Sequence, residues 1–304
     1  MHSFPLRLHG PGVSGSCRSP AAIAAKVAMS NHFVYIVMDS CRYDSFVRAR
    51  TPNIDRLGPT ERRWSYASWT APSHHAFLMG LTPHASPTHV YASEVYKKDF
   101  VQWVRRLEVP NLSFGTFLPE LSLPKVLGDN GYRRIARVSM PVLNSFTLLN
   151  QHFDDYRLMD DHNDFAGIVE EIEFPDDQPR FYFLNLGETH YPYMLSDDAL
   201  PHISGVHGVF KSLAANNGPT GNLTSLDETF FDQAAMDALH DQQVSCVEYI
   251  DGLIGALFDK CPANTHILVT ADHGELFGED GYFGHGPIMH EKCFEVPLIE
   301  GRVP

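Results

Sequence analysis

The segment SWTAPSHHAFLMG, residues 68–80, places a threonine, a serine and two histidines where a helix is expected to start. Pro72 suits the first helical turn, so Thr70 should lie just before that helix. Backbone N–H groups at a helix start lack partners and, together with the helix dipole, favour an anion. The segment therefore predicts either an anion site with Thr70 as its reactive edge, or an ordinary helix capped by Thr70 or Ser73.

Three short apolar runs, each ending at polar side chains, predict buried strands of a parallel sheet. They are FVYIVMD (33–39), RFYFLNL (180–186) and THILVTAD (265–272). Asp39 ends the first run, Glu188 and His190 follow the second, and Asp272 ends the third, with His273 directly after it. Ligands in such sheets bind beyond the carboxyl ends of the strands, so these groups should converge. Carboxylate oxygens and imidazole together suit a divalent cation such as Zn, Mn, Mg or Ca.

The elements that must position these groups alternate along the chain. Helical patterns fall at residues 122–134 and 242–260, between the expected strands. Strands that alternate with helices indicate an α/β fold, with a mixed, largely parallel β-sheet sandwiched between helices. Residues 84–120 and 202–229 show little periodicity, and we expect long surface loops there that carry substrate specificity.

Composition narrows the class of partner. The chain has 304 residues, 43% of them hydrophobic, and a formal net charge of −14. This charge argues against nucleic acid or an anionic membrane surface as a general partner, since both require a basic surface. With only 23 Lys and Arg residues, a metal ion is a natural positive centre for an anionic substrate.

Cysteine spacing, the length of apolar runs and the composition of the N-terminal segment predict localisation and domain organisation. The five cysteines show no CxxC spacing and their number is odd, which predicts a reduced, cytoplasmic protein. No apolar run approaches the length of a membrane span. Residues 1–28 lack acidic residues and any packing pattern, so we expect a disordered or non-native extension. Residues 29–304 should then form a single domain.

Several segments, taken in order, resemble one known family. They are VMDSCRYDS with TPNIDRL, SWTAPSHHAFLMGLTPH, FLNLGETHYPY, and ADHGELFGEDGYFGHG with EVPLI. Over most of residues 33–300 the chain resembles the alkaline phosphatase and sulfatase superfamily. The resemblance implies that family's fold, with a reduced C-terminal subdomain because the sequence stops soon after EVPLIEG. It also implies that Asp39, Asp272 and His273 bind metal, and that Thr70 is both nucleophile and metal ligand.

The sequence departs from the sulfatase pattern at informative positions. Sulfatases carry an oxidised cysteine where Thr70 stands here, whereas a direct hydroxyl is typical of the phosphatase, phosphodiesterase and phospho-headgroup transferase branches. Ser40 replaces a frequent second acid, and Leu186 stands where two-zinc phosphodiesterases place an aspartate, four residues before His190. We therefore predict one divalent metal ion and not a complete second site.

The remaining site residues are assigned to the substrate. His190 and His285 should bind substrate oxygens or protonate the leaving group. His74 and Ser73 lie next to the expected nucleophile and could line the pocket. Arg42 follows the first metal-ligand candidate, where it could contact substrate or form a structural salt bridge.

These residues predict a metal-dependent hydrolase of phosphate mono- or diesters that acts through Thr70, because metal coordination lowers the pKa of a hydroxyl. Three alternatives remain: a phospho-headgroup transferase, a sulfatase acting through Thr70, and a non-catalytic binding protein with this fold. In the catalytic cases the partner is a small anionic ester. The substrate, the metal and the oligomeric state are left open by the sequence.

Overall fold

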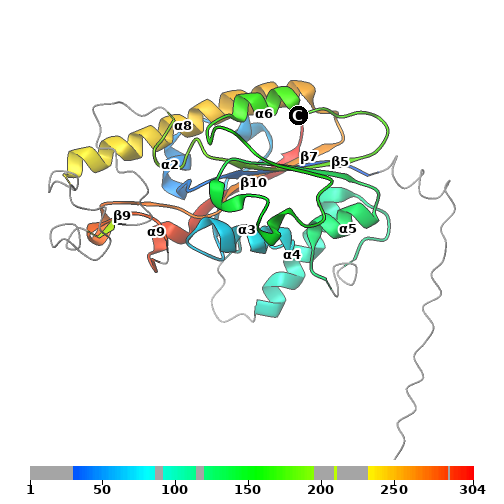
Figure 1. Ribbon diagram of the computed structural model, residues 1–304, viewed down its shortest axis with the longest axis horizontal. Coiled ribbons are helices and arrows are strands. Elements are labelled where there is room, and N and C mark those ends of the chain that lie inside the picture. Colours follow the sequence, from blue (N-terminus) through cyan, green and yellow to red (C-terminus); the bar gives the residue numbers. More distant parts are fainter. Residues whose placement is uncertain (1–29, 86–91, 114–119, 195–208, 211–231, 287) are drawn as a thin grey trace, which may run out of the picture.

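A central sheet lies between two layers of helices in the computed structural model, which describes residues 30–85, 92–113, 120–194, 209–210, 232–286 and 288–304 (Figure 1). In spatial order its seven strands are β2 (Glu61–Trp64), β10 (Glu295–Arg302), β7 (Thr265–Ala271), β1 (His32–Met38), β5 (Arg180–Leu186), β3 (Arg133–Val138) and β4 (Asp155–Leu158). β10 pairs antiparallel with β7 and β2, and the remaining pairs are parallel. The predicted mixed, largely parallel sheet is therefore confirmed.

β1 is the centre of the fold because both of its faces are apolar. Phe33, Tyr35 and Val37 pack into one core, and the residues between them pack into the other. Helices α2 (Tyr43–Arg48), α6 (Phe165–Glu171) and α8 (Gln233–Lys260) cover one face. Helices α3 (Thr70–Leu78), α4 (Ala92–Leu107) and α5 (Leu123–Asp129) cover the other. Water is thereby excluded from both faces of the strands that carry the candidate site.

A smaller unit extends beyond the carboxyl ends of the central strands (Figure 1). Its antiparallel sheet, in spatial order, consists of β6 (Val209–Phe210), β9 (Tyr282–Gly284) and β8 (Leu276–Phe277). Helix α9 (Glu291–Phe294) leads from this unit into β10. The short 3-10 helices are η1 (Ile54–Arg56), η3 (Pro141–Leu143), η4 (Leu148–Asn150) and η6 (Glu279–Gly281). A third apolar cluster, which includes Tyr193, Met236 and Phe283, joins this unit to α8.

The predicted strands at 33–39, 180–186 and 265–272 correspond to β1, β5 and β7. The predicted loop at 84–120 is wrong in part, because α4 is a helix of 16 residues. Its buried residues Phe100, Trp103 and Leu107 recur at helical spacing, but the many charged residues between them obscure the pattern. Among the described helices, none is both long and apolar enough to cross a membrane.

Two other predictions concern segments about which the structure says little. The expected extension at 1–28 lies outside the described residues. The expected loop at 202–229 also lies outside them, apart from the short strand β6. Both stay predictions.

Asp251 provides a test of how α8 supports the fold. Its carboxylate is buried and accepts the backbone N–H groups of Asn53 and Ile54 at 3.1 and 2.8 Å. Asp251→Ala leaves these donors without an acceptor, and we expect the free energy of unfolding to fall by about 2 kcal/mol in urea titrations. Asp259→Ala, on an exposed position of the same helix, is the control and should change stability by less than about 0.5 kcal/mol. Equal effects of the two substitutions would contradict the assigned role.

Candidate functional site

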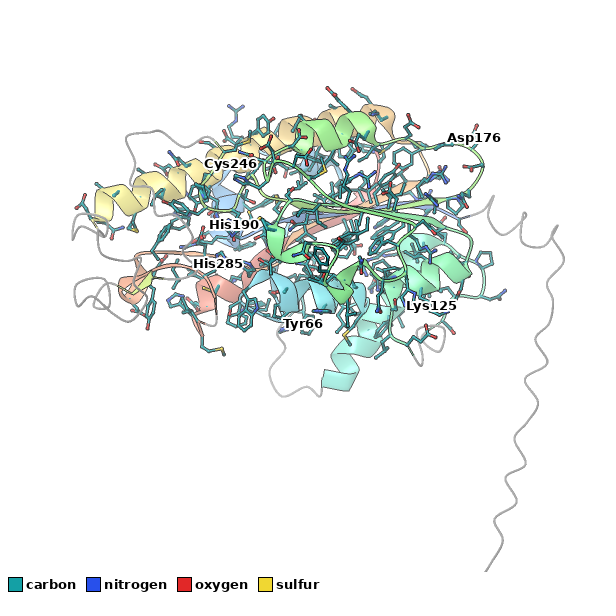
Figure 2. All side chains as sticks on the ribbon, in the orientation of Figure 1. Tyr66, Lys125, Asp176, His190, Cys246 and His285 are labelled. Atoms are coloured by element: carbon teal, nitrogen blue, oxygen red, sulfur yellow. The ribbon has the colours of Figure 1, made fainter. Side chains whose placement is uncertain are left out.

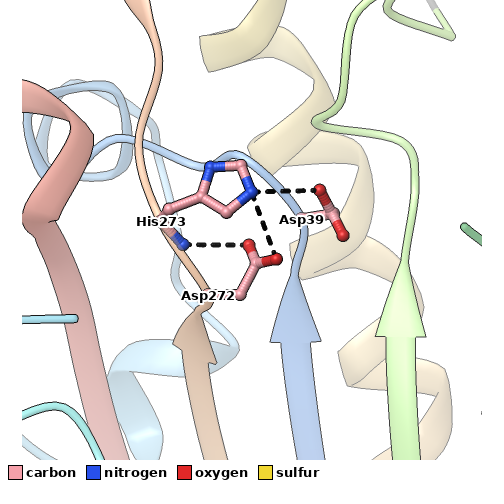
Figure 3. Close-up of side chains that lie close together, drawn as sticks. All are labelled: Asp39, Asp272 and His273. Carbon is pink, nitrogen blue, oxygen red and sulfur yellow. Dashed lines mark hydrogen bonds and ion pairs between the residues drawn. The ribbon is translucent and has the colours of Figure 1, made fainter. Parts of the chain in front are cut away.

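The three predicted metal ligands converge at the carboxyl ends of β1 and β7 (Figure 3). Asp39 directly follows β1, and Asp272 and His273 directly follow β7. His273 Nε2 lies 3.3 Å from Asp272 Oδ2 and 3.8 Å from Asp39 Oδ1, and all three side chains are fully buried. One ligand atom from each lies within 4.8 Å of the others. The parallel pairing of β1 with β7 therefore brings together groups from opposite ends of the domain.

Thr70 joins this cluster from the start of α3. It is the first residue of the helix, one position further in than the sequence predicts, and the N-cap residue is Trp69. The hydroxyl Oγ1 lies 3.3 Å from His273 Nε2 and 3.5 Å from Asp39 Oδ1. The Ser73 hydroxyl instead donates to the backbone carbonyl of Ala67. The alternative of an ordinary capping hydroxyl at Thr70 or Ser73 is thus not what the structure shows.

Asn185, which sequence reasoning missed, orients Asp39. Its amide Nδ2 donates to Asp39 Oδ2 at 2.8 Å, and its Oδ1 accepts the backbone N–H groups of Ser139 and Met140, both at 3.1 Å. This leaves Asp39 Oδ1 as the oxygen nearest to Thr70 and His273. The signal in the sequence was a single amide in the otherwise apolar run FYFLNL, at the end of a buried strand.

Ser40 and Gln243 hold the loop after β1 in place. Ser40 adopts a left-handed backbone, φ 61°, which allows its N–H to donate to Asp272 Oδ1 at 3.1 Å. The fully buried Gln243 of α8 donates to the carbonyls of Ser40 and Thr189 and accepts the N–H of Arg42. A single side chain therefore fixes the loops that follow both β1 and β5. A glutamine within a long amphipathic helix gave no signal for this role.

His273 presents a defined nitrogen to the cluster. Its Nδ1 lies 2.9 Å from the carbonyl oxygen of Gly274, which can only accept a hydrogen bond. Nδ1 therefore carries the proton, and the lone pair of Nε2 faces Asp39, Thr70 and Asp272. Burial lowers the pKa of His273 to about 4, so the imidazole is neutral at pH 7. A neutral imidazole with a directed lone pair is the form that binds a metal.

The two carboxylates give the second indication of a cation. Burial and the negative charge of Asp39 raise the pKa of Asp272 well above its usual range. Burial also opposes ionisation of Asp39, but the nearby His190 and His273 lower its pKa overall. Within the described residues, Asp272 Oδ2 receives no hydrogen bond. A buried oxygen without a donor beside a second buried carboxylate fits a divalent cation, so the residues present match the predicted metal.

The two histidines predicted to act on the substrate lie beside this centre. The His285 ring lies 4.4 Å from the His273 ring, and the His190 ring lies 5.0 Å from the His285 ring, centroid to centroid. Figure 2 shows His190 and His285 at the same end of the sheet. His285 Nδ1 lies 3.2 Å from Glu275 Oε1 and 3.3 Å from Ser40 Oγ. Both rings therefore lie beside the cluster of Asp39, Asp272 and His273.

His74 lies next to the ligands, but in the interior. Its Nδ1 lies 2.8 Å from the carbonyl oxygen of Thr70 and 3.7 Å from Asp272 Oδ2. Its ring packs edge-on against Phe77 and Phe183, and burial lowers its pKa to about 4. The structure therefore gives His74 a supporting position between α3 and the sheet.

Two predicted substrate contacts are corrected. Arg42 is buried, with Nε and Nη2 donating to Asp44 at 2.7 and 2.6 Å and Nη1 donating to Glu279 at 2.5 Å. The two acidic neighbours occupy the guanidinium, so the structural salt bridge is the correct alternative. The Ser73 hydroxyl is likewise used inside the protein, on the Ala67 carbonyl.

The buried cluster of Asp39, Asp272 and His273, with Thr70 beside it at the start of α3, agrees with the resemblance to the alkaline phosphatase and sulfatase superfamily. The family model described as Sulfatase matches residues 31–299. The chain therefore belongs to the sulfatase family. A search of the curated proteins finds no match.

Solved structures of similar fold include a phosphoethanolamine transferase domain and a protein in complex with a disulfated sugar. The C-terminal periplasmic domain of EptC from Escherichia coli aligns with a TM-score of 0.54 and 13% identity, over 90% of this chain and 73% of that one; its zinc complex aligns with a TM-score of 0.51. The corresponding domain of phosphoethanolamine transferase EptC from Campylobacter jejuni aligns with a TM-score of 0.51 and 16% identity. The alignment covers 90% of this chain and 80% of that one. BT4656, in complex with its substrate D-glucosamine-2-N,6-O-disulfate, aligns with a TM-score of 0.53 and 14% identity. The alignment covers 90% of this chain and 71% of that one. At these identities the likeness concerns the fold.

The first test of the site is metal binding. We expect the wild-type protein to bind one equivalent of zinc in calorimetric titrations, and Asp272→Asn to bind at least roughly tenfold more weakly, because one anionic ligand is lost. Asp44→Asn, which changes a carboxylate that pairs with Arg42, is the control and should retain wild-type affinity. Full zinc affinity in Asp272→Asn would refute the ligand assignment.

Glu188 allows a test by pH. This buried side chain accepts the N–H of Phe165, the first residue of α6, at 2.7 Å, and burial raises its pKa to about 7. The folded protein holds the proton longer than the unfolded chain, so stability should fall as pH rises from about 4.5 to about 7.

In Glu188→Gln this contribution disappears. The difference in unfolding free energy between wild type and variant should change by roughly 1 kcal/mol for each pH unit in that window, measured by urea unfolding at several pH values. A difference that does not depend on pH would contradict the raised pKa.

Proposed function

We propose that this protein cleaves phosphate esters by direct attack of the Thr70 hydroxyl on phosphorus. The observation that carries the proposal is the position of Thr70 Oγ1, 3.3 Å from His273 Nε2 and 3.5 Å from Asp39 Oδ1, at the N-terminus of α3. A hydroxyl buried among carboxylates and imidazole is placed for chemistry. The helix N-terminus beside it favours an anionic group.

The residues that would hold a divalent cation are Asp39, Thr70, Asp272 and His273. When bound, the cation would lower the pKa of the Thr70 hydroxyl and offset the charge of a phosphoryl group. The zinc complex of the similar E. coli domain supports zinc as the first metal to test. We propose a single ion, since Ser40 and Leu186 offer no further acidic ligand.

The reaction has two steps. The Thr70 oxygen, after releasing its proton to solvent, forms a bond to phosphorus, and the bond to the ester oxygen breaks with its electron pair on the leaving group. Water then cleaves the phosphothreonine and restores the hydroxyl. Donors at the start of α3 and the imidazoles of His190 and His285 would bind the phosphoryl oxygens during both steps. Asn185 holds the Asp39 carboxylate, and Gln243 holds the loop after β1, during both steps.

The second candidate is a phospho-headgroup transferase, in which an acceptor other than water takes the phosphoryl group from Thr70. Its support is the similarity of fold to a phosphoethanolamine transferase. A sulfatase acting through Thr70 is less well supported, because sulfatases use an oxidised cysteine at this position and no cysteine stands here. A cytoplasmic location is also part of the proposal, supported by the four cysteines in the described part of the chain, which are all free thiols. Cell fractionation tests it directly.

The decisive variant is Thr70→Ala. We expect turnover of the best substrate in a screen of aryl phosphate mono- and diesters to fall by roughly 10⁴ to 10⁶, as when other hydrolases lose their nucleophile. Thr70→Ser should keep part of the activity, since the hydroxyl survives. A quenched wild-type digest should carry phosphate on the peptide that contains Thr70.

The screen also separates the alternatives. Retained turnover in Thr70→Ala together with an unmodified peptide would contradict the nucleophile role. Faster turnover and a new phosphate ester of the added alcohol, a monoester from a monoester donor or a diester from a diester donor, would indicate the transferase. Activity only on sulfate esters would indicate the sulfatase, and zinc binding without any turnover would indicate a binding protein.

A further inference from the structure

Beside His285 lie two buried polar side chains that the proposed reaction does not use. Tyr193, in the segment after β5, donates its hydroxyl to Glu275 Oε2 at 2.5 Å. The other oxygen of the same carboxylate, Oε1, lies 3.2 Å from His285 Nδ1. The three residues are between 1% and 2% exposed, so water does not compete for these contacts. These hydrogen-bonding contacts link Tyr193, through Glu275, to His285, whose ring lies beside that of His273.

The backbone around His285 is anchored separately. The N–H of Gly286 donates to the Ser68 carbonyl at 3.2 Å, and the Ser68 hydroxyl donates to the Gly286 carbonyl at 2.6 Å. This anchor ties the loop to the segment that leads into Thr70. These backbone contacts do not fix the rotation of the imidazole. The neighbouring residues Gly284 and Gly286, with φ angles of 87° and 132°, have no side chains to support the ring. The ring must therefore be held by contacts of its own.

We propose that Glu275 and Tyr193 are positioning residues, which fix the His285 imidazole with Nδ1 toward Glu275 and Nε2 toward the ligand side of the metal cluster. The proposal rests on the proposed function, in which His285 contacts the phosphoryl group. Ser40 Oγ, 3.3 Å from the same Nδ1, assists but also contacts Asp39. Unlike Ser40, the Glu275 side chain makes no hydrogen bond with Asp39. Tyr193 limits the rotation of the Glu275 carboxylate through its hydrogen bond.

The arrangement follows a general rule for catalytic histidines. A ring whose one nitrogen is held by a carboxylate presents the other nitrogen in a fixed direction, and a third group holds the carboxylate. Such outer partners act through the histidine and do not touch the substrate. Their loss typically costs roughly 10- to 100-fold in activity. Removing the histidine should therefore abolish the contribution of its partners.

A double-mutant cycle tests this dependence on the full-length, zinc-loaded protein. Glu275→Gln and Tyr193→Phe should each lower kcat by roughly 10- to 100-fold, with a smaller change in KM. Added to His285→Ala, neither substitution should lower kcat further, because the group that they position is already absent. Multiplicative losses would show a structural role and overturn the proposal.

Two matched controls separate positioning from the loss of any buried polar group. Asp251→Asn changes another buried carboxylate, on α8, and Tyr182→Phe removes a hydroxyl that contacts the backbone of Glu173. Both should leave kcat within roughly twofold of the wild type. Losses as large as those of Glu275→Gln would contradict a specific effect on His285.

A spectroscopic measurement stands apart from activity. In zinc-loaded protein labelled with ¹⁵N in the histidine rings, the His285 signals are identified by their absence in His285→Gln. Glu275→Gln should shift these ring signals by several ppm, and Tyr193→Phe should shift the same signals by less. Unchanged signals in both variants would overturn the positioning role.

The two measurements also distinguish failures. Shifted ring signals in a protein that turns over no ester would support the positioning and contradict the proposed function. Should Glu275→Gln not fold, Tyr193→Phe, which removes only one oxygen atom, decides the outcome through both the cycle and the ring signals.

Discussion

The candidate site depends on the burial of two carboxylates at the ends of neighbouring strands. Asp39 and Asp272 are fully buried, and desolvation, together with the negative charge of Asp39, raises the pKa of Asp272 well above its usual range. Such a pair is costly in a protein without a cation, because neither charge can be screened by water. A cation at this position would also need a neutral imidazole with a directed lone pair, and His273 provides one. The local chemistry thus calls for a metal ion before any reaction is considered.

The rest of the domain keeps these groups from relaxing away from one another. Asn185 fixes one oxygen of Asp39, the backbone of Ser40 fixes one oxygen of Asp272, and Gln243 fixes the two loops through which this occurs. Each of these contacts crosses between elements that are remote in sequence. The apolar layers on both faces of β1 exclude water from them. The same packing that stabilises the sheet therefore sets the orientation of the ligands.

The sequence predicts the fold class and the clustering of Asp39, Asp272 and His273 well, because both depend on strong local patterns. β1, β5 and β7 are runs of apolar residues bounded by polar ones, and parallel sheets gather strand ends at one edge. The helix α4 was missed because charged residues dilute its apolar face. Arg42 and Ser73 were assigned to substrate because their partners, Glu279 and the Ala67 carbonyl, are set only by tertiary structure. Asn185 and Gln243 were missed for the same reason, since an amide gives no sign of which loop it will hold.

The wide separation of the site residues in sequence has a consequence for biosynthesis. The contact between Ser40 and Asp272 spans 232 positions. At translation rates of about 5–20 residues per second, roughly ten to fifty seconds separate the synthesis of these two residues. During that interval the nascent chain holds Asp39 without Asp272 and His273, so the set of candidate ligands is incomplete. The full set of candidate ligands therefore exists only after β7 has been translated, in the compartment where the sheet closes.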